Sequence, residues 1–365
     1  MKKKIPTISL CMIVKDEEDT IARCLDSIQE VVDEIVIVDT GSSDQTKEIV
    51  KKYTNKVFDF EWIDDFAAAR NFSFSKATKD YILWLDADDV LPKEEKEKFL
   101  DLKKSLSKNI DVVSMLYHVT FDKHGNPVIS TDRKRLVKRE RKFQWSGVVH
   151  EDLDVSGNIL KSNIGIVHKK EKRITDRNLQ IFEKAIERGR QLTTREVIHY
   201  AGECLGHQKF EKAIELYNNI TKEDQYGIEE KVYACSKLAD CYVNVGKWDE
   251  AIDSCLLALK YDIPRAEICC RLGYFFLSAK MEYEKAIYWY KNALEVPVPT
   301  NSPLVDRACH TWFPHLQLCI CYCHVEDYEK AYEHNEKAAV FVPDNELVQA
   351  NRKYVSKMLK EKEEI

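Results

Sequence analysis

Apolar and polar positions follow one pattern in the first half of the chain. Short apolar runs at 8–14, 34–39 and 81–86 alternate with stretches in which apolar residues recur every three or four positions. Helices are expected at 20–28, 44–52, 66–77 and 93–107, and further strands at 56–60, 111–121 and 164–167. Apolar strands that alternate with helices predict an α/β domain whose parallel sheet is covered on both faces.

The second half contains a repeated pentad instead of strands. Each copy has an aromatic residue, an acid, a second acid or a lysine, an alanine and a large residue. The copies lie at 210–214, 248–252, 283–287 and 328–332. Their spacing resembles that of the tetratricopeptide repeat, a helix–turn–helix unit of about 34 residues. We therefore expect an α/β domain at 1–170, a linker and first helix at 171–195, an all-α repeat superhelix at 196–343 and a capping helix at 344–365.

Composition excludes several functional classes. The 365 residues carry a formal net charge of −6, so nucleic acid is not the expected partner, because phosphate contacts need clustered basic residues. No apolar run reaches the roughly 18–20 residues of a transmembrane helix, so we expect no membrane anchor. The N-terminal apolar run ends in charged residues without a cleavage site, so we expect a strand and not an export signal. The 12 cysteines are then expected to be reduced thiols of a cytoplasmic protein.

Acidic side chains follow two of the predicted strands. Asp39 precedes a loop that contains Gly41 and runs into a helix, and Asp86-Ala-Asp88 follows the run that ends at residue 86. Ligands of parallel sheets bind at these carboxyl ends. Two carboxylates two positions apart can hold Mg²⁺ or Mn²⁺, although Asp-X-Asp alone also occurs in ordinary loops. Asp39 can accept a hydrogen bond from a base or a ribose, because the glycine permits close approach.

Five motifs in order carry a family resemblance. They are the segments 8–18, 34–46, 66–71 and 84–89, and the pair 133–138 with 145–151. Together they resemble the family 2 glycosyltransferases of the GT-A fold, and the last is similar to a branch that carries tetratricopeptide repeats. Within that branch the chain looks most like bacteriocin peptide S-glycosyltransferases of the sublancin-modifying type. The resemblance is specific for the fold and for nucleotide-sugar use, but not for the acceptor.

The resemblance implies a site for a UDP-sugar and a divalent cation, Mn²⁺ or Mg²⁺. Asp39 would hold uracil or ribose, and Arg70 would reach the base or the diphosphate. The nucleotide-sugar residues that the resemblance implies are Val14, Lys15, Asp39, Arg70, Asp86, Asp89 and Arg135. The metal would be held by Asp86, by Asp88 as the principal ligand, and by His168.

The basic segment 133–142 has two interpretations. Seven of its ten residues are Lys or Arg, which is typical of a solvated edge strand whose charges prevent pairing with another chain. Arg135 stands apart because the family pattern also has arginine there, so we expect it to face the diphosphate or the acceptor. Asp89 is expected either to touch the sugar or to cap its own loop.

Inverting glycosyl transfer needs a base beside the incoming nucleophile and positive charge on the leaving diphosphate. The candidate catalytic residues are His150, Glu151 and Asp152, with Glu151 or Asp152 as the base. Glu151 could instead be a loop carboxylate that pairs with the basic segment.

The expected function is metal-dependent transfer of a hexose from a UDP-sugar, with UDP-glucose favoured, to a Cys or Ser/Thr side chain of a peptide or protein. The repeats would help to bind that acceptor. One alternative is transfer to a surface glycan, a lipid-linked glycan or a modified nucleic acid. Another is an inactive tetratricopeptide scaffold. The sequence does not decide the oligomeric state, homodimer included.

Overall fold

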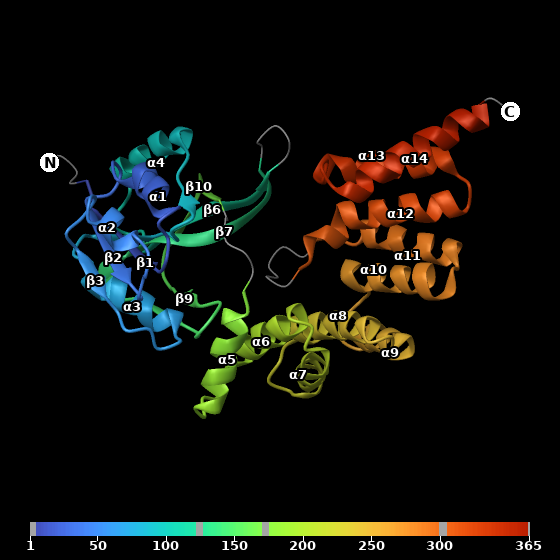
Figure 1. Cartoon of the computed structure of the whole chain (residues 1–365), viewed down its shortest axis with the longest axis horizontal. Helices are drawn as coiled ribbons and strands as arrows, with labels where there is room; N and C mark the ends of the chain where they lie inside the picture. Colours follow the sequence, from blue (N-terminus) through green and yellow to red (C-terminus); the bar gives the residue numbers. More distant parts are fainter. Residues whose placement is uncertain (1–4, 122–126, 170–174, 299–304, 364–365) are drawn as a thin grey trace. The chain divides into compact units, whose positions relative to one another are not determined.

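The computed structural model describes residues 5–121, 127–169, 175–298 and 305–363. The chain divides into two compact units at residue 191 (Figure 1). The N-terminal unit contains β1 Ile8–Val14, α1 Ile21–Ile28, β2 Glu34–Asp39, α2 Thr46–Val50, β3 Val57–Asp59, α3 Phe66–Lys76, β4 Tyr81–Trp84, β5 Asp89–Val90, α4 Lys93–Ser105, β6 Val112–Phe121, β7 Pro127–Lys138, η1 Arg139–Arg141, β8 Gln144–Ser146, β9 Asp152–Asp154, β10 Ile159–His168 and α5 Arg177–Glu187.

The larger sheet has the strand order β3-β2-β1-β4-β7-β6-β10-β5. The first four strands are parallel, as their apolar runs predicted. The prediction of a wholly parallel sheet is wrong, because β7 runs antiparallel to both β4 and β6. The edge-strand interpretation of the basic segment is wrong for the same reason. Leu136 and Val137 of β7 are buried opposite Leu83 and Ile82 of β4.

Each face of the sheet has its own core, because side chains alternate along a strand. In β1, Leu10 and Met12 join a core with the apolar face of α1, whereas Cys11 joins a second core with α3 and Trp145. The residues of α1 that the helical spacing placed inside, such as Leu25, are buried. Because both faces of the sheet are packed against a core, the ends of its strands are held in place. The candidate site lies at those ends.

The C-terminal unit is helical over its described residues. It contains α6 Thr194–Gly206, α7 Phe210–Lys222, α8 Ile228–Asn244, α9 Trp248–Ala258, α10 Ala266–Phe275, η2 Phe276–Lys280, α11 Tyr283–Glu295, η3 Arg307–His310, α12 Trp312–His324, α13 Tyr328–Phe341 and α14 Glu346–Glu363. Consecutive helices pack as hairpins, and Figure 1 shows α10 to α14 stacked in chain order. None of the helices in the described ranges is both long and apolar enough to cross a lipid bilayer.

The four pentads begin α7, α9, α11 and α13, and their alanines are buried at the packed faces. Small residues allow this close packing. A Cβ atom on Gly273 would lie 2.9 Å from the ring of Tyr290, which is fully buried. The α/β unit followed by a repeat superhelix confirms the predicted fold class.

The N-terminal unit extends past residue 170, where the sequence suggested that the domain ends. Helix α5 belongs to this unit. Lys184 and Arg188 on α5 contact the Asp64 carboxylate at 3.3 and 3.0 Å. These ion pairs hold α5 against the loop that precedes α3.

Candidate active site

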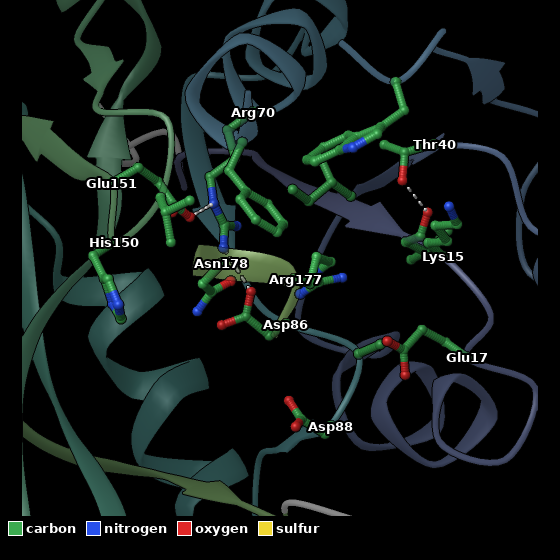
Figure 2. Close-up of a pocket in the computed structure, with 16 residues that line it drawn as sticks. Lys15, Glu17, Thr40, Arg70, Asp86, Asp88, His150, Glu151, Arg177 and Asn178 are labelled. Carbon is green, nitrogen blue, oxygen red and sulfur yellow. Dashed lines mark hydrogen bonds and ion pairs between the residues drawn. The ribbon is translucent and has the colours of Figure 1, made fainter. Parts of the chain in front are cut away.

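A cavity of about 320 Å³ lies at the carboxyl ends of β1 and β4, where ligands of parallel sheets bind (Figure 2). Its lining comes from several segments far apart in the sequence. The lining residues are Ile13, Val14, Lys15, Glu17, Thr40, Trp62, Phe66, Arg70, Asp86, Ala87, Asp88, Val149, His150, Glu151, Arg177 and Asn178. The size lies at the lower end of the range of typical small-molecule sites. The cavity brings together most of the residues expected from the sequence.

Asp39 ends β2 beside this cavity and is 1% exposed. Its Oδ1 accepts hydrogen bonds from the backbone N–H groups of Gly41 and Ser42, both at 2.9 Å. Gly41 has a φ of +103°, a conformation that glycine adopts without strain. Oδ2 of Asp39 is buried and has no hydrogen-bond partner in the described part of the chain. That oxygen is available to a polar ligand, although Thr40 and not Asp39 lines the cavity wall.

Arg70 on α3 joins two acidic residues of the cavity. Its Nη2 donates to Oδ1 of Asp86 at 2.8 Å, and its Nε donates to Oε1 of Glu151 at 2.5 Å (Figure 2). The guanidinium also lies over the rings of Trp84 and Trp145, at 5.1 and 4.8 Å from their centroids. Arg70 therefore fixes both carboxylates, and it is a buried residue of α3 and not a surface arginine.

The charge of Asp86 depends on these contacts. Burial by itself would raise the pKa of Asp86, but the charges of Arg70 and Arg135 outweigh burial and lower it to about 2. Burial by itself would lower the pKa of Arg70, but the carboxylates of Asp86 and Glu151 outweigh burial and raise it. Asp86 and Arg70 are therefore both ionised near neutral pH.

Asp88, Asp89 and His168 form a group that can hold a metal ion, with one ligand atom of each within 4.8 Å of the others. Nδ1 of His168 lies 3.5 Å from Oδ1 of Asp88 and 3.7 Å from Oδ1 of Asp89. Nδ1 of His168 and Oδ1 of Asp89 are buried without a hydrogen-bond partner among the described residues. Such orphaned atoms, with a donor set of two carboxylates and an imidazole, fit a divalent cation such as Mn²⁺.

This group differs from the expected set. Asp89 takes the place expected for Asp86, whose carboxylate bonds to Arg70. Asp88 and Asp89 also raise the pKa of His168 to about 9 through their interactions with its imidazole. The chain brings His168 to the two aspartates because β10 pairs with β5, with His168 opposite Asp89.

Arg135 does not line the cavity, contrary to our expectation that it faces the diphosphate or the acceptor. It is 1% exposed, its Nη2 lies 2.9 Å from Oδ2 of Asp89, and its guanidinium lies 3.9 Å from the Trp84 ring centroid. Asp89 is fully buried, and its Oδ2 also accepts from the backbone N–H of Asp86. Asp89 therefore caps its own loop, the simpler of its two interpretations, and Arg135 supports it from behind.

The loop before β9 carries the candidate catalytic residues. His150 has a φ of +53°, and it lines the cavity together with Glu151. Asp152 is the first residue of β9, opposite Ser146, and does not line the cavity. Helix α3 anchors this loop, because the backbone N–H of Phe66 donates to the carbonyl of Val148 at 3.0 Å.

Sequence reasoning missed several lining residues. Trp62 and Phe66 pack edge to face at 4.8 Å beside the cavity, and Arg177 and Asn178 reach it from the first turn of α5. Trp62 stood between predicted elements, and Phe66 began a predicted helix and a family motif without being assigned to the site. Arg177 and Asn178 stood in the segment 171–195, which was expected to be a linker and first helix. Polar residues that begin an amphipathic helix just after the last strand are the signal that could have found them.

Comparisons with known proteins agree with this geometry. Residues 9–160 match the model of the family described as glycosyl transferase family 2, and residues 234–267 match the tetratricopeptide repeat model. The chain is 32% identical over 154 residues to the SPbeta prophage-derived glycosyltransferase SunS of Bacillus subtilis, a match that covers 41% of this chain and 36% of that protein. It is 49% identical over 84 residues to a TPR repeat-containing protein of Synechococcus elongatus, which covers 23% of this chain and 21% of that one.

Among solved structures, glucosyl-3-phosphoglycerate synthase from Mycobacterium tuberculosis is similar at 18% identity and a TM-score of 0.36, over 52% of this chain and 81% of that one. The chain spans 36% of the length of SunS and 21% of the length of the Synechococcus protein. The family models nevertheless agree with the structure. The glycosyl transferase match falls on the parallel strands and their acidic loops, and the tetratricopeptide match falls on the helical hairpins. Residues 9–160 belong to glycosyl transferase family 2, and the chain joins this domain to tetratricopeptide repeats.

Proposed function

We propose that this protein is a metal-dependent inverting glycosyltransferase that moves a hexose from a UDP-sugar to a Cys or Ser/Thr side chain of a peptide or protein. The observation that carries this proposal is that one cavity contains two carboxylates joined by an arginine and, beside them, a group of residues that can hold a metal ion. Glu151 and Asp86 share Arg70, and Asp88 lines the same cavity beside His168. UDP-glucose is the donor that the family resemblance favours.

Glu151 is the base in this proposal. Its Oε1 accepts from Arg70, and a carboxylate has further lone pairs for the proton of an acceptor S–H or O–H. The bond between C1 of the sugar and the β-phosphate oxygen breaks, and its electron pair goes to that oxygen. The acceptor sulfur or oxygen bonds to C1 from the opposite side, and its proton passes to Glu151. A metal held by Asp88, Asp89 and His168 would supply positive charge to the diphosphate.

The repeats are proposed to bind the acceptor. Stacked helical repeats present extended surfaces suited to peptides, whereas the described residues that line the donor cavity all precede residue 179. Donor and acceptor recognition would therefore be divided between the two units. A peptide acceptor suits this division better than a small molecule, which needs no separate binding surface.

Replacing Asp88 with alanine tests the metal assignment. The Asp88 side chain is half-buried and belongs to neither core of the N-terminal unit, so the variant should fold. We expect the Mn²⁺ concentration for half-maximal UDP-glucose turnover to rise at least about tenfold. Removing a group that only supports a metal ligand already lowers metal affinity by about tenfold or more, and Asp88 is proposed as a ligand itself. The measurement is a Mn²⁺ titration of initial rates, with Asp19→Ala as the control because Asp19 is exposed outside the cavity. Unchanged turnover of Asp88→Ala in EDTA would contradict the assignment.

Ending the chain at Gln191 tests the role of the repeats. The two cores on the faces of the large sheet contain only residues before 170, so the sheet keeps its packing. We expect UDP-glucose hydrolysis to continue, whereas KM for a peptide acceptor should rise at least about tenfold, the change that a loss of about 1.4 kcal/mol of binding energy produces. Mass spectrometry of peptides incubated with UDP-sugars gives the acceptor, since one added hexose marks transfer. An unchanged acceptor KM would remove the repeats from acceptor binding.

A further inference from the structure

The donor cavity is rich in acidic groups. Glu17, Asp86, Asp88 and Glu151 line it, against the cations Lys15, Arg70 and Arg177. Arg70 is already bonded to two of these carboxylates. A diphosphate therefore needs positive charge beyond that of Arg70, which the resemblance placed at the base or the diphosphate.

We propose that Arg177 is the residue that stabilises the leaving diphosphate. This inference rests on the proposed function and deepens it. The Arg177 side chain lies in the cavity (Figure 2), and it makes no ion pair with any residue that the structure describes. The residue lies outside the segment that matches the family model, so the family match gives it no role.

Two sets of contacts hold Arg177 in this position. Its guanidinium lies 4.9 Å from the ring centroid of Phe66, a cation–π distance that keeps the charge at the cavity wall. About two and three turns further along the chain from Arg177, Lys184 and Arg188 contact Asp64. The first turn of α5 is thereby set against the cavity by contacts that do not use Arg177 itself.

The position is costly for the helix, which favours a functional role. A cation in the first turn of a helix opposes the helix dipole, and Arg177 forms no carboxylate contact there among the described residues to offset this. When the bond from C1 to the β-phosphate oxygen breaks, that oxygen gains one negative charge. A planar guanidinium suits phosphate oxygens and would stabilise this charge more in the transition state than in the bound donor.

Arg177→Ala in the full chain should therefore lower kcat for UDP-glucose turnover with Mn²⁺ about 10²–10³-fold, the usual effect of removing one such donor. KM for UDP-glucose should change less than kcat. Inhibition by UDP should weaken more than donor binding, because UDP carries the additional charge. Arg177→Lys should restore part of kcat. The matched control is Arg141→Ala, since Arg141 is a partly exposed arginine of the same unit outside the cavity.

The outcomes separate this inference from the proposed function. No turnover of any UDP-sugar by the wild-type chain would refute the proposed function. An active wild-type chain with a folded Arg177→Ala variant within threefold of its kcat would overturn only the role of Arg177. A large loss that Arg177→Lys does not restore at all would also overturn it, because it would assign Arg177 to holding α5 in place.

Discussion

Replacing Glu151 with glutamine lowers the transfer rate about 10²–10⁴-fold if Glu151 is the base, the usual contribution of a general base. The amide keeps the size of the side chain, and its oxygen still accepts from Arg70, so the cavity should keep its shape. It has no carboxylate to take a proton. UDP binding should change little, because the proposed contacts of UDP come from Asp39, Arg177 and the metal group. Initial rates and UDP titrations measure the two effects separately.

The control for this variant is Asp154→Asn, which removes an exposed carboxylate from β9. A wild-type rate for Glu151→Gln would exclude Glu151 and move the assignment to Asp152. Asp89 is not an alternative base, since it is fully buried and paired with Arg135.

The size of the Glu151→Gln defect should also report the nucleophile. A free cysteine has a pKa near about 8.5, so part of it is already thiolate at neutral pH. A serine hydroxyl stays protonated and needs the base throughout. With a Cys acceptor the defect should therefore shrink between about pH 7 and about pH 9, whereas with a Ser acceptor it should not.

Replacing Arg70 with alanine should destabilise the N-terminal unit by about 3 kcal/mol, the lower end for removing one partner of a buried ion pair. Arg70 is 8% exposed, and its loss would leave the Glu151 carboxylate, which is 12% exposed, without its cation. The lower value applies because the Asp86 side chain is 38% exposed and water can solvate it in part. Calorimetric unfolding of the full chain measures the change, with Arg70→Lys as the variant that keeps the charge.

The same variant has a pH signature with a definite sign. The pKa of Asp86 is lowered to about 2 in the folded protein, below its usual value near about 3.9. The stabilisation linked to Asp86 is therefore complete above about pH 4 and is lost as the pH falls towards 2. The difference between wild type and Arg70→Ala should accordingly narrow in that window. A difference that stays constant down to pH 3 would show that Asp86 does not depend on Arg70.

The sequence predicted those parts of the fold that local periodicity determines. The mostly apolar run at 8–14 is typical of a strand buried on both faces, and the spacing within 20–28 matches the buried face of α1. Asp39 and Asp88 were predicted because each stands at the end of a predicted strand, and Arg70 because the segment 66–71 carries the family resemblance. The pentads predicted the helical hairpins for the same reason, since each copy carries its own packing face.

Features that depend on distant pairing could not be predicted in this way. The segment around Arg135 reads as solvated, and only the insertion of β7 between β4 and β6 buries it against Asp89. Asp89 likewise joins His168 because β5 pairs with β10. Arg177 reaches the cavity through ion pairs between α5 and Asp64 that leave no periodic trace in the sequence.

The anchoring of α5 also bears on how such proteins can diversify. Because α5 belongs to the N-terminal unit, the division at residue 191 leaves every described lining residue of the donor cavity on one side. Recombination of genes at this point would exchange whole repeat arrays without interrupting the donor cavity. Under the proposed division of labour, new acceptor preferences could then arise by module replacement, while donor chemistry is inherited unchanged. The same junction is the natural place to engineer chimaeras that direct one sugar donor to different peptides.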